Sequence, residues 1–152
     1  MTHHSRFAAS VHILAYLAFR AGALVASGEI AASVATNPVV IRRLLAALVK
    51  GHLVRARKGA AGGFALAQPS RHISLLAIYR AVEPAPTHGM RHFAPNHHCP
   101  VGAKIEEVLH GIFKRAQAGM EAELGSVSLA EVEARLHPVC PGRKKEPEAP
   151  SR

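Results

Sequence analysis

The sequence predicts a mainly α-helical fold with one small β-hairpin, and three features support this prediction. Residues 27–50 carry two short apolar patterns of helical spacing, separated by a Thr-Asn-Pro turn. Residues 53–66 hold two short strand candidates around a glycine-rich turn. Residues 101–124 repeat apolar residues at helical spacing over more than five turns. This order predicts a winged helix-turn-helix followed by a long C-terminal helix.

The first predicted helix covers residues 5–22 and has a broad apolar face. A face this broad suggests contacts on two sides, one of them with the winged domain. Its apolar residues are Phe7, Val11, Ile13, Leu14, Tyr16, Leu17 and Ala18.

The two helices of the helix-turn-helix are predicted from their caps and apolar stripes. Pro38 suits the first turn of the second helix, because the N–H that proline lacks would have no partner there. That helix runs to about Lys50 and ends at Gly51, with Arg42 and Arg43 opposite its apolar stripe. The cap candidates are Ser27 or Gly28 for the first helix and Thr36 or Asn37 for the second. The stripe of the second helix consists of Ile41, Leu44, Leu45, Leu48 and Val49.

The remaining elements follow from turn and cap signals. Leu53-Val54 and Phe64–Leu66 are the strand candidates of the hairpin, around residues 57–63. Ile73–Val82 is expected to form a short helix that begins at Ser70 or Ser74. The capping box at residues 128–131 opens a last helix that ends at about Leu136.

Positive charge is concentrated in the first half of the chain. The whole sequence has a formal net charge of +9, and residues 1–80 alone hold ten Lys/Arg residues against one acid, Glu29. Residues 81–140 are net negative, with five basic and seven acidic residues. Such segregation indicates a polyanionic partner. A helix of this size fits the major groove of DNA, and a glycine-rich tip lets backbone approach a phosphate or a minor groove.

Residues 29–66 resemble the winged helix-turn-helix of the Rrf-two family of bacterial transcription regulators, the IscR/NsrR/BadM-like group. The resemblance covers the Ile-Ala pair of the first helix, the pattern of the second helix and the Lys-Gly-x-x-Gly-Gly-Phe of the wing. It implies a homodimer that represses or tunes transcription. Four positions depart from the family pattern: Val40 replaces a tyrosine, His52 a glycine, Lys58 an arginine and Phe64 a tyrosine.

This layout predicts the contacts with double-stranded DNA, whose site in a dimer is an imperfect inverted repeat. The second helix is expected to enter the major groove, and the wing a minor groove or phosphates. The expected DNA-binding residues are Asn37, Val39, Arg42, Arg43, Arg57, Lys58, Gly59, Gly62 and Gly63. The expected division is 1–83 for the DNA-binding domain, 84–100 for a sensor loop, 101–137 for dimerisation and 138–152 for a disordered tail.

The long helix carries a stripe that suits a dimer interface. An already complete winged domain leaves this stripe without a surface to cover, and the resemblance implies the same use. Its apolar residues are Ile105, Val108, Leu109, Ile112, Phe113, Ala116, Met120 and Leu124.

The loop before the long helix raises the question of a sensor. Members of the resembled family often bind an iron–sulfur cluster through three cysteines here, whereas this chain has Cys99 alone in that window, so no cluster is expected. Three alternatives stay open: Cys99 is a redox-sensing thiol, it binds zinc together with His97 or His98, or it has no role. Supporting candidates are His88 and His92 for a metal site and Cys140 as a resolving thiol.

Other classes of protein fit less well. A thiol hydrolase built on Cys99 and a neighbouring histidine would need an acidic residue and an oxyanion loop, which the sequence does not offer nearby. A DNA-binding protein without any sensor remains an alternative. No apolar stretch has the length and composition of a membrane span, and two cysteines are too few for a disulfide framework, so we expect a cytoplasmic protein without a membrane partner.

Overall fold

The computed structural model describes residues 3–136, except 21, 60, 84–95 and 97, and confirms the predicted fold class. Six α-helices and one two-stranded antiparallel sheet are present in these residues. The elements are α1 (His3–Phe19), α2 (Ser27–Val34), α3 (Pro38–Lys50), β1 (Val54–Arg57), β2 (Gly63–Leu66), the 3-10 helix η1 (Ser70–His72), α4 (Leu75–Val82), α5 (Ile105–Ser126) and α6 (Leu129–Leu136).

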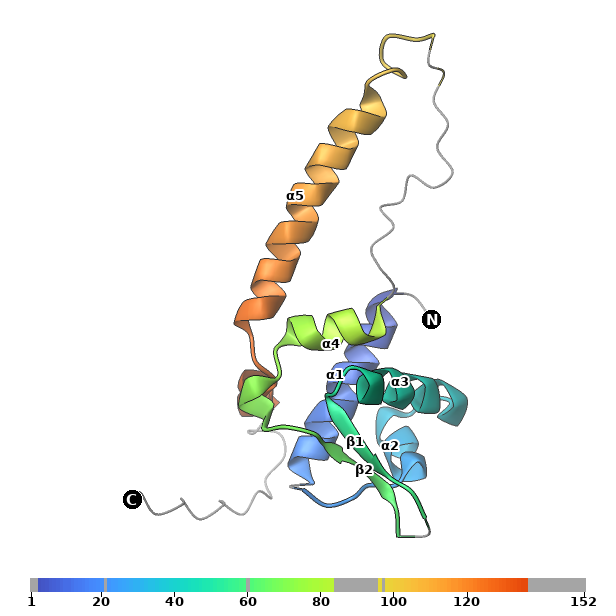
Figure 1. Cartoon of the computed structure of the whole chain (residues 1–152), viewed down its shortest axis with the longest axis vertical. Helices are drawn as coiled ribbons and strands as arrows, with labels where there is room; N and C mark the ends of the chain where they lie inside the picture. Colours follow the sequence, from blue (N-terminus) through green and yellow to red (C-terminus); the bar gives the residue numbers. More distant parts are fainter. Residues whose placement is uncertain (1–2, 21, 60, 84–95, 97, 137–152) are drawn as a thin grey trace, which may run out of the picture.

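The core is formed where α1 packs against α2, α3, α4 and β2 (Figure 1). Each buried aliphatic side chain contributes about 1.5–3 kcal/mol through the hydrophobic effect. The largest buried side chains are Ile13, Leu14, Leu17, Val25, Ile30, Ile41, Leu44, Leu45, Leu48, Ile73, Ile78 and Leu129. The N–H of Leu129 donates to the Ile73 carbonyl at 2.8 Å, which ties the start of α6 to the segment before α4.

The hairpin pairs β1 with β2, from Val54 opposite Leu66 to Arg57 opposite Gly63. A third segment extends this sheet, since Val25 and Phe64 exchange two backbone hydrogen bonds of 2.9 Å. Gly63 is required for this approach, because a Cβ atom there would lie 2.8 Å from the carbonyl oxygen of Val25. The hairpin therefore joins the helical body through both its own strands and the segment before α2.

Both helices of the helix-turn-helix end with a residue in the left-handed conformation. After α2, Ala35 has φ 52°, and after α3, His52 has φ 57°. At the end of α3, the N–H of Leu53 donates to the Leu48 carbonyl and that of His52 to the Val49 carbonyl, both at 3.0 Å. This is the Schellman pattern, in which glycine usually occupies the left-handed position. Here the glycine, Gly51, stands one residue earlier, with φ −79°.

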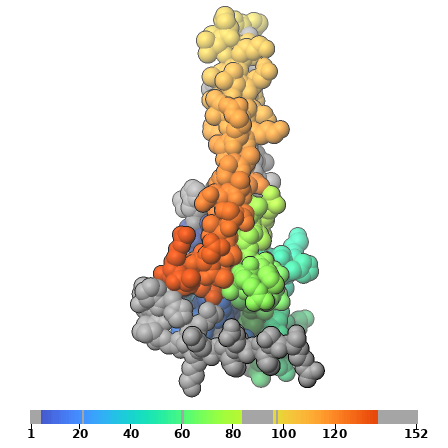
Figure 2. Space-filling view, turned by 90° about the vertical axis from the view of Figure 1, so that its left-hand side faces the viewer, coloured from blue at the N-terminus to red at the C-terminus, as the bar shows by residue number. Residues whose placement is uncertain are grey.

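The α5 helix stands apart from the body. It leaves the core beside α4 and rises from it as a narrow column (Figures 1 and 2). None of its residues is buried. At its lower end, Arg80 of α4 donates to Glu121 at 2.6 Å, and Gln117 donates to the same carboxylate at 2.8 Å. These two bonds hold the pKa of Glu121 below its usual value, with Gln117 the larger cause.

Several predicted boundaries and caps need correction. The α1 helix ends at Phe19, before the predicted residue 22. The α2 helix begins at Ser27 itself, so neither Ser27 nor Gly28 caps it; its cap residue, Ala26, offers no side-chain hydrogen bond. The α5 helix begins at Ile105, not at residue 101, because residues 101–104 form successive turns.

The predicted caps of the other helices are confirmed. The Asn37 side chain accepts a hydrogen bond from the N–H of Val39 at 2.8 Å. Ser74 caps α4 by accepting from the N–H of Ala77 at 3.2 Å, while Ser70 begins the short helix η1. At α6, Ser128 and Glu131 make the predicted reciprocal capping box, and the hydrogen bonds from Ser128 lower the pKa of Glu131.

Among the described residues, no single helix is long and apolar enough to cross a membrane. The α2 and α3 helices reach that length and hydropathy only as a pair, and they bend by 112° at the turn between them.

Candidate nucleic-acid interface

The α3 helix buries one face in the core and exposes the opposite one. Ile41, Leu44, Leu45 and Leu48 are buried, as predicted. Arg42 and Arg43 lie on the exposed face, and Val39 is exposed at the start of the helix, with 49% of its surface accessible. An apolar side chain so exposed beside two arginines is a feature of surfaces that meet base edges, where methyl groups and hydrogen-bond acceptors alternate.

Asn37 was predicted both as a cap of the second helix and as a DNA-binding residue, and the structure shows the cap. Its side-chain oxygen accepts the N–H of Val39 and so caps α3. The cap orients the side chain and leaves its NH₂ group, which carries two donors, available for a partner.

The tip of the hairpin carries the predicted wing residues. Arg57 and Lys58 are exposed, and Gly59 has φ +105°, a conformation that glycine adopts without strain. We expected Gly62 and Gly63 to provide close backbone access. Neither lies in the left-handed region, and the reason for glycine is lack of space. A Cβ atom on Gly62 would lie 2.2 Å from the Arg57 carbonyl oxygen, so this glycine closes the turn.

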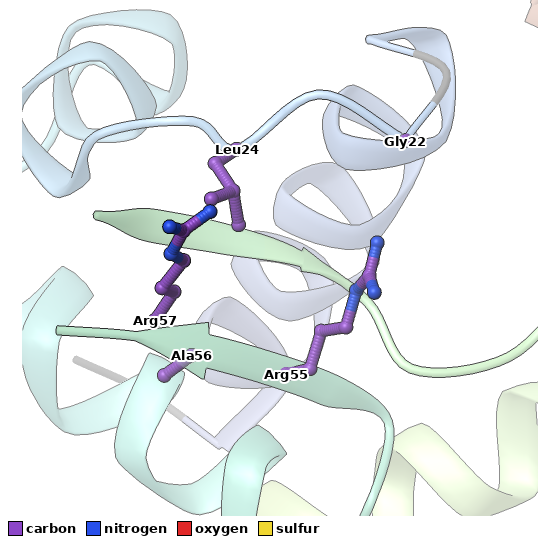
Figure 3. Close-up of a pocket in the computed structure, with 5 residues that line it drawn as sticks. All are labelled: Gly22, Leu24, Arg55, Ala56 and Arg57. Carbon is purple, nitrogen blue, oxygen red and sulfur yellow. The ribbon is translucent and has the colours of Figure 1, made fainter. Parts of the chain in front are cut away.

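One basic residue near the wing was missing from the predicted set. Arg55 lies two positions before Arg57 on β1, and both side chains point to the same side of the hairpin (Figure 3). Together with Gly22, Leu24 and Ala56 they line an open depression of about 440 Å³, which we name the outer groove. The strand alternation of Arg-Ala-Arg could have indicated this pairing, but β1 was expected to end at Val54.

The single acid of the basic half of the chain is engaged within the fold. Glu29, in the first turn of α2, accepts hydrogen bonds from Tyr16 at 2.7 Å and from Arg20. The pKa of Arg20 is raised, first by Tyr16 and then by the charge of Glu29. This cluster joins α1 to α2, and among the described residues no ion pair engages the arginines of α3 or the cations of the wing.

The turns before α5, which contain Cys99, lie at the other end of the molecule from the hairpin (Figure 1). The Cys99 thiol is exposed, and the N–H groups of Gly102 and then Val101 lower its pKa. Asn96 shapes this turn, since its carbonyl accepts the N–H of Cys99 and its side chain accepts the N–H of His98, both at 3.0 Å. A Cβ atom on Gly102 would lie 2.2 Å from the Asn96 carbonyl oxygen, so the turn depends on glycine.

The other candidates for a sensor are placed only in part. His98 is exposed, whereas His88, His92, His97 and Cys140 lie outside the described residues. Within the described part of the chain, no three His, Cys, Asp or Glu side chains come together as a metal site. The DNA-binding candidates thus share one end of the molecule, and Cys99 lies apart from all of them.

The predicted stripe of α5 contains several large apolar side chains that are exposed. Val108, Ile112 and Phe113 are 56%, 46% and 40% exposed, and Met120 is 36% exposed. Four large apolar side chains along one helix form a continuous exposed strip of a kind that usually meets another protein surface.

Three comparisons place the chain among known proteins. The family model described as "Rrf2: Iron-dependent Transcriptional regulator" matches residues 3–135. The protein named "Putative HTH-type transcriptional regulator YwnA", from Bacillus subtilis (strain 168), is 40% identical over 129 residues, covering 85% of this chain and 95% of YwnA. The crystal structure of "a putative DNA binding protein" is 38% identical with a TM-score of 0.67, covering 84% of this chain and 97% of that one.

A second crystal structure, of "a putative transcriptional regulator" from Lactobacillus plantarum, shares the fold more closely. Its TM-score is 0.78 at 29% identity, and the match covers 87% of this chain and 89% of that one. These relatives are regulators rather than enzymes, in agreement with the predicted class. With a family model that spans the helix-turn-helix, the wing and α5, this chain belongs to the Rrf2 family of transcriptional regulators, the Rrf-two family of the resemblance above.

Proposed function

We propose that this protein is a homodimeric regulator that binds a specific DNA sequence with α3 in the major groove. The observation that carries the proposal is the two-sided character of α3. Its apolar face is locked into the core, and its other face presents Val39, Arg42 and Arg43 to solvent. A helix held this rigidly can place side chains against base edges reproducibly, which sequence-specific binding requires.

Each exposed group of α3 suits a different feature of DNA. Arg42 and Arg43 can each donate two hydrogen bonds to the O6 and N7 atoms of a guanine. Val39 can pack against the methyl group of a thymine, and the free NH₂ of Asn37 can donate to a base or a phosphate. The wing adds Lys58 and Arg57 beside a glycine tip, which suits a minor groove or the phosphates that flank it.

The α5 helix supports the dimeric part of the proposal. It is about 33 Å long at the usual rise per residue, and the large apolar side chains Val108, Ile112 and Met120 are exposed along it. A second copy offers the same strip, so a twofold pairing would bury both. The two α3 helices of such a dimer would contact half-sites about one helical turn apart, or a multiple of that, in an imperfect inverted repeat.

Selection of bound sequences from random DNA tests the function directly. We expect an enriched inverted repeat, and mass measurement in solution should give a dimer at micromolar concentration. Arg71→Ala is a matched control, because it removes an exposed arginine that lies outside α3 and the wing. If no sequence is enriched, the protein does not recognise a specific operator. If the wild type is a monomer, the proposed twofold pairing and its inverted repeat are wrong.

A specific observation favours a second element of function, a redox response through Cys99. The thiol is exposed, and two backbone N–H groups stabilise its thiolate form. A thiolate attacks hydrogen peroxide to give a sulfenic acid and hydroxide, with two electrons passing from sulfur to the peroxide oxygens. Because Cys99 lies in the turns that lead into α5, its modification would reach the helix that we assign to dimerisation.

Peroxide treatment of wild type and two variants tests this response. Oxidation should change operator affinity in wild type and not in Cys99→Ser, whose untreated affinity should match that of wild type. Gly102→Ala should slow the reaction of the thiol with peroxide, because its Cβ atom cannot fit against Asn96 and the N–H groups would move away. An unaltered oxidant response in Cys99→Ser would refute the role of Cys99 and make Cys140 the next residue to test.

Metal-based sensing is less well supported by the donor set. The family description names iron, but the three-thiolate pattern of the clusters needs more cysteines than Cys99 and Cys140, the two that this sequence contains. We therefore propose a protein without an iron–sulfur cluster that acts in the cytoplasm. A metal-responsive variant of the function, with zinc on Cys99 and His98 or His97, predicts instead that a chelator changes DNA binding.

A further inference from the structure

The short helix α4 contacts both α3 and the lower end of α5 (Figure 1). It spans eight residues, of which Ile78 and Val82 are buried in the core. The helix that we propose to read DNA is thus linked through α4 to the helix that we propose to pair two copies. The contacts that α4 makes with each of them therefore affect how α5 is oriented relative to α3.

Two backbone hydrogen bonds fix the lower end of α5 to the start of α4. The N–H of Leu75 donates to the Val127 carbonyl at 2.9 Å, and the N–H of Leu129 donates to the Ile73 carbonyl at 2.8 Å. Together they form an isolated antiparallel bridge, which we name the α4–α5 bridge, and the adjoining Leu129 side chain is fully buried. This bridge is the fixed point from which both helices extend.

From the α4–α5 bridge the two helices run side by side in opposite directions. A Cβ atom on Gly125 would lie 3.5 Å from the Cδ2 atom of Leu76, which is an ordinary packing distance. About one turn further along each helix, Arg80 donates to Glu121 at 2.6 Å. Gln117 donates to the same carboxylate at 2.8 Å. The Glu121 carboxylate therefore holds α5 against α4 above the bridge.

The face of α5 that carries Glu121 is opposite to the exposed apolar strip. Glu121 follows Ile112 by nine residues, which is about two and a half helical turns, so the two side chains project from opposite sides of the helix. A second copy on the strip and α4 on the other face do not compete for the same surface. The contact with α4 therefore sets the direction in which each protomer presents its strip.

At the end of α4 away from the bridge, the approach to α3 is so close that glycine is needed. A Cβ atom on Gly51 would lie 3.0 Å from the Cβ atom of Ala81. Gly51 has φ −79°, outside the left-handed region, so the requirement is for space. Carbon atoms pack best at about 3.5–4.0 Å, so an alanine at this position would push α4 away from α3 by about 0.5–1 Å.

The lengths of the helices amplify such a shift. At 1.5 Å per residue, Ala81 lies about 10 Å from the α4–α5 bridge along α4, and Ile112 lies about 24 Å from it along α5. When both helices turn together about the bridge, a shift of about 0.5–1 Å at Ala81 becomes about 1–2 Å at Ile112. In a twofold dimer both protomers shift, by about 2–4 Å in total, which is comparable with the rise of about 3.4 Å per base pair.

We propose that α4 is a lever that sets the spacing of the two half-sites, with Gly51 and Glu121 as positioning residues. This inference rests on the proposed function and extends it, because neither residue belongs to the proposed DNA contacts. Glu121 couples α5 to α4, and Gly51 sets the distance between α4 and α3. Specificity for the length of the operator is thereby built into contacts inside the protomer.

Three operators test this proposal, with the selected half-sites and a spacer of the selected length, one base pair shorter or one base pair longer. The readout is the ratio of the dissociation constants measured by gel shift. Glu121→Gln should loosen α5 and lower the preference for the selected spacer by about two- to fivefold, toward both alternatives. Gly51→Ala should tilt α5 in one direction and so favour one altered spacer over the other.

Matched controls separate the lever from general effects of substitution. Glu107→Gln removes the carboxylate of the ion pair with Lys104, which lies within the start of α5 and does not involve α4. Gly28→Ala adds a methyl group where nothing lies within 4 Å. Both should keep the wild-type ratios. Gly51→Ala/Ala81→Gly removes the Cβ atom that the new methyl group would meet, and it should restore the wild-type ratios.

The outcomes distinguish this inference from the proposed function. A wild-type protein that selects no operator contradicts the function itself. A wild-type protein that prefers one spacer, with unchanged ratios in both Glu121→Gln and Gly51→Ala, overturns the lever alone. Affinity lost equally on all three operators also overturns it, because the substitutions then act on the fold or on α3. If Gly51→Ala fails to fold by circular dichroism, the ratios of Glu121→Gln against those of Glu107→Gln decide.

Discussion

Replacement of His52 by glycine should stabilise the protein. His52 follows α3 with φ 57°, in a position where the Schellman pattern favours glycine. Its imidazole is exposed and makes no hydrogen bond or ion pair with the described residues. The left-handed conformation costs an L-residue about 1–2 kcal/mol, and His tolerates it better than most, which favours the lower end. Glycine avoids this cost but loses about 0.4–1 kcal/mol through the greater freedom of its unfolded chain.

The difference between these two effects is a net gain of about 0.5 kcal/mol in the free energy of unfolding, and up to about 1 kcal/mol. For a chain of this size, the melting temperature should rise by roughly 1–4 °C. Thermal unfolding measured by circular dichroism at fixed protein concentration provides the assay, since the stability of a dimer varies with concentration.

His52→Ala distinguishes the backbone from the side chain. It removes the imidazole and retains the Cβ atom that makes the conformation unfavourable, so its melting temperature should stay close to that of wild type. If His52→Ala stabilises as much as His52→Gly, the gain comes from loss of the imidazole and the backbone argument is refuted. A lower melting temperature for His52→Gly would show that the left-handed position costs histidine almost nothing here.

Four further predictions concern binding, stability and assembly. Arg42→Ala and Arg43→Ala should each weaken operator binding by about 1–3 kcal/mol in a gel shift while sparing scrambled DNA, and equal losses on both DNAs would reduce them to phosphate contacts. Gly63→Val should lower the melting temperature, because its side chain would collide with the backbone of Val25. An unchanged melting temperature would show that the two segments can move apart without loss of stability. Ile112→Glu should give a monomer by sedimentation, because it places a charge in the proposed interface. The pKa of Glu121 is lowered in the folded state, so its contribution to stability is present above the unfolded pKa and is lost as pH falls through the folded pKa. The free energies of unfolding of wild type and Glu121→Gln should therefore converge in acid. An equal difference at all pH values would refute this reasoning.

The helix-turn-helix could be predicted from the sequence because its signals are local. Pro38 and Gly51 bracket α3, and the Asn37 cap acts within two residues. The long stripe of α5 was also visible, since helical periodicity needs no knowledge of the partner. The start of α5 was misplaced, because the turns of residues 101–104 are set by hydrogen bonds and a close contact of Gly102 with Asn96 that leave no periodic trace.

The parts of the site that depend on contacts between distant segments were not predictable. The outer groove forms because the segment before α2 lies beside the hairpin, and local sequence patterns do not predict a contact between such distant segments. The reason for Gly63 is likewise the backbone of Val25, 38 positions earlier in the chain. The left-handed His52 was noticed only as a departure from a family pattern, and its conformation became evident from φ.

The engagement of Glu29 within the fold has a consequence for how the protein responds to its surroundings. Glu29 is the only Asp or Glu among residues 3–82, and its carboxylate already accepts hydrogen bonds from Tyr16 and Arg20. No acid remains there whose protonation could raise or lower the field near neutral pH. The attraction that we propose for DNA therefore depends on the cations of this half of the chain and is weakened by ionic strength. Under the proposed function, control over DNA binding would come from geometry, through the turns before α5 or the proposed pairing of two copies.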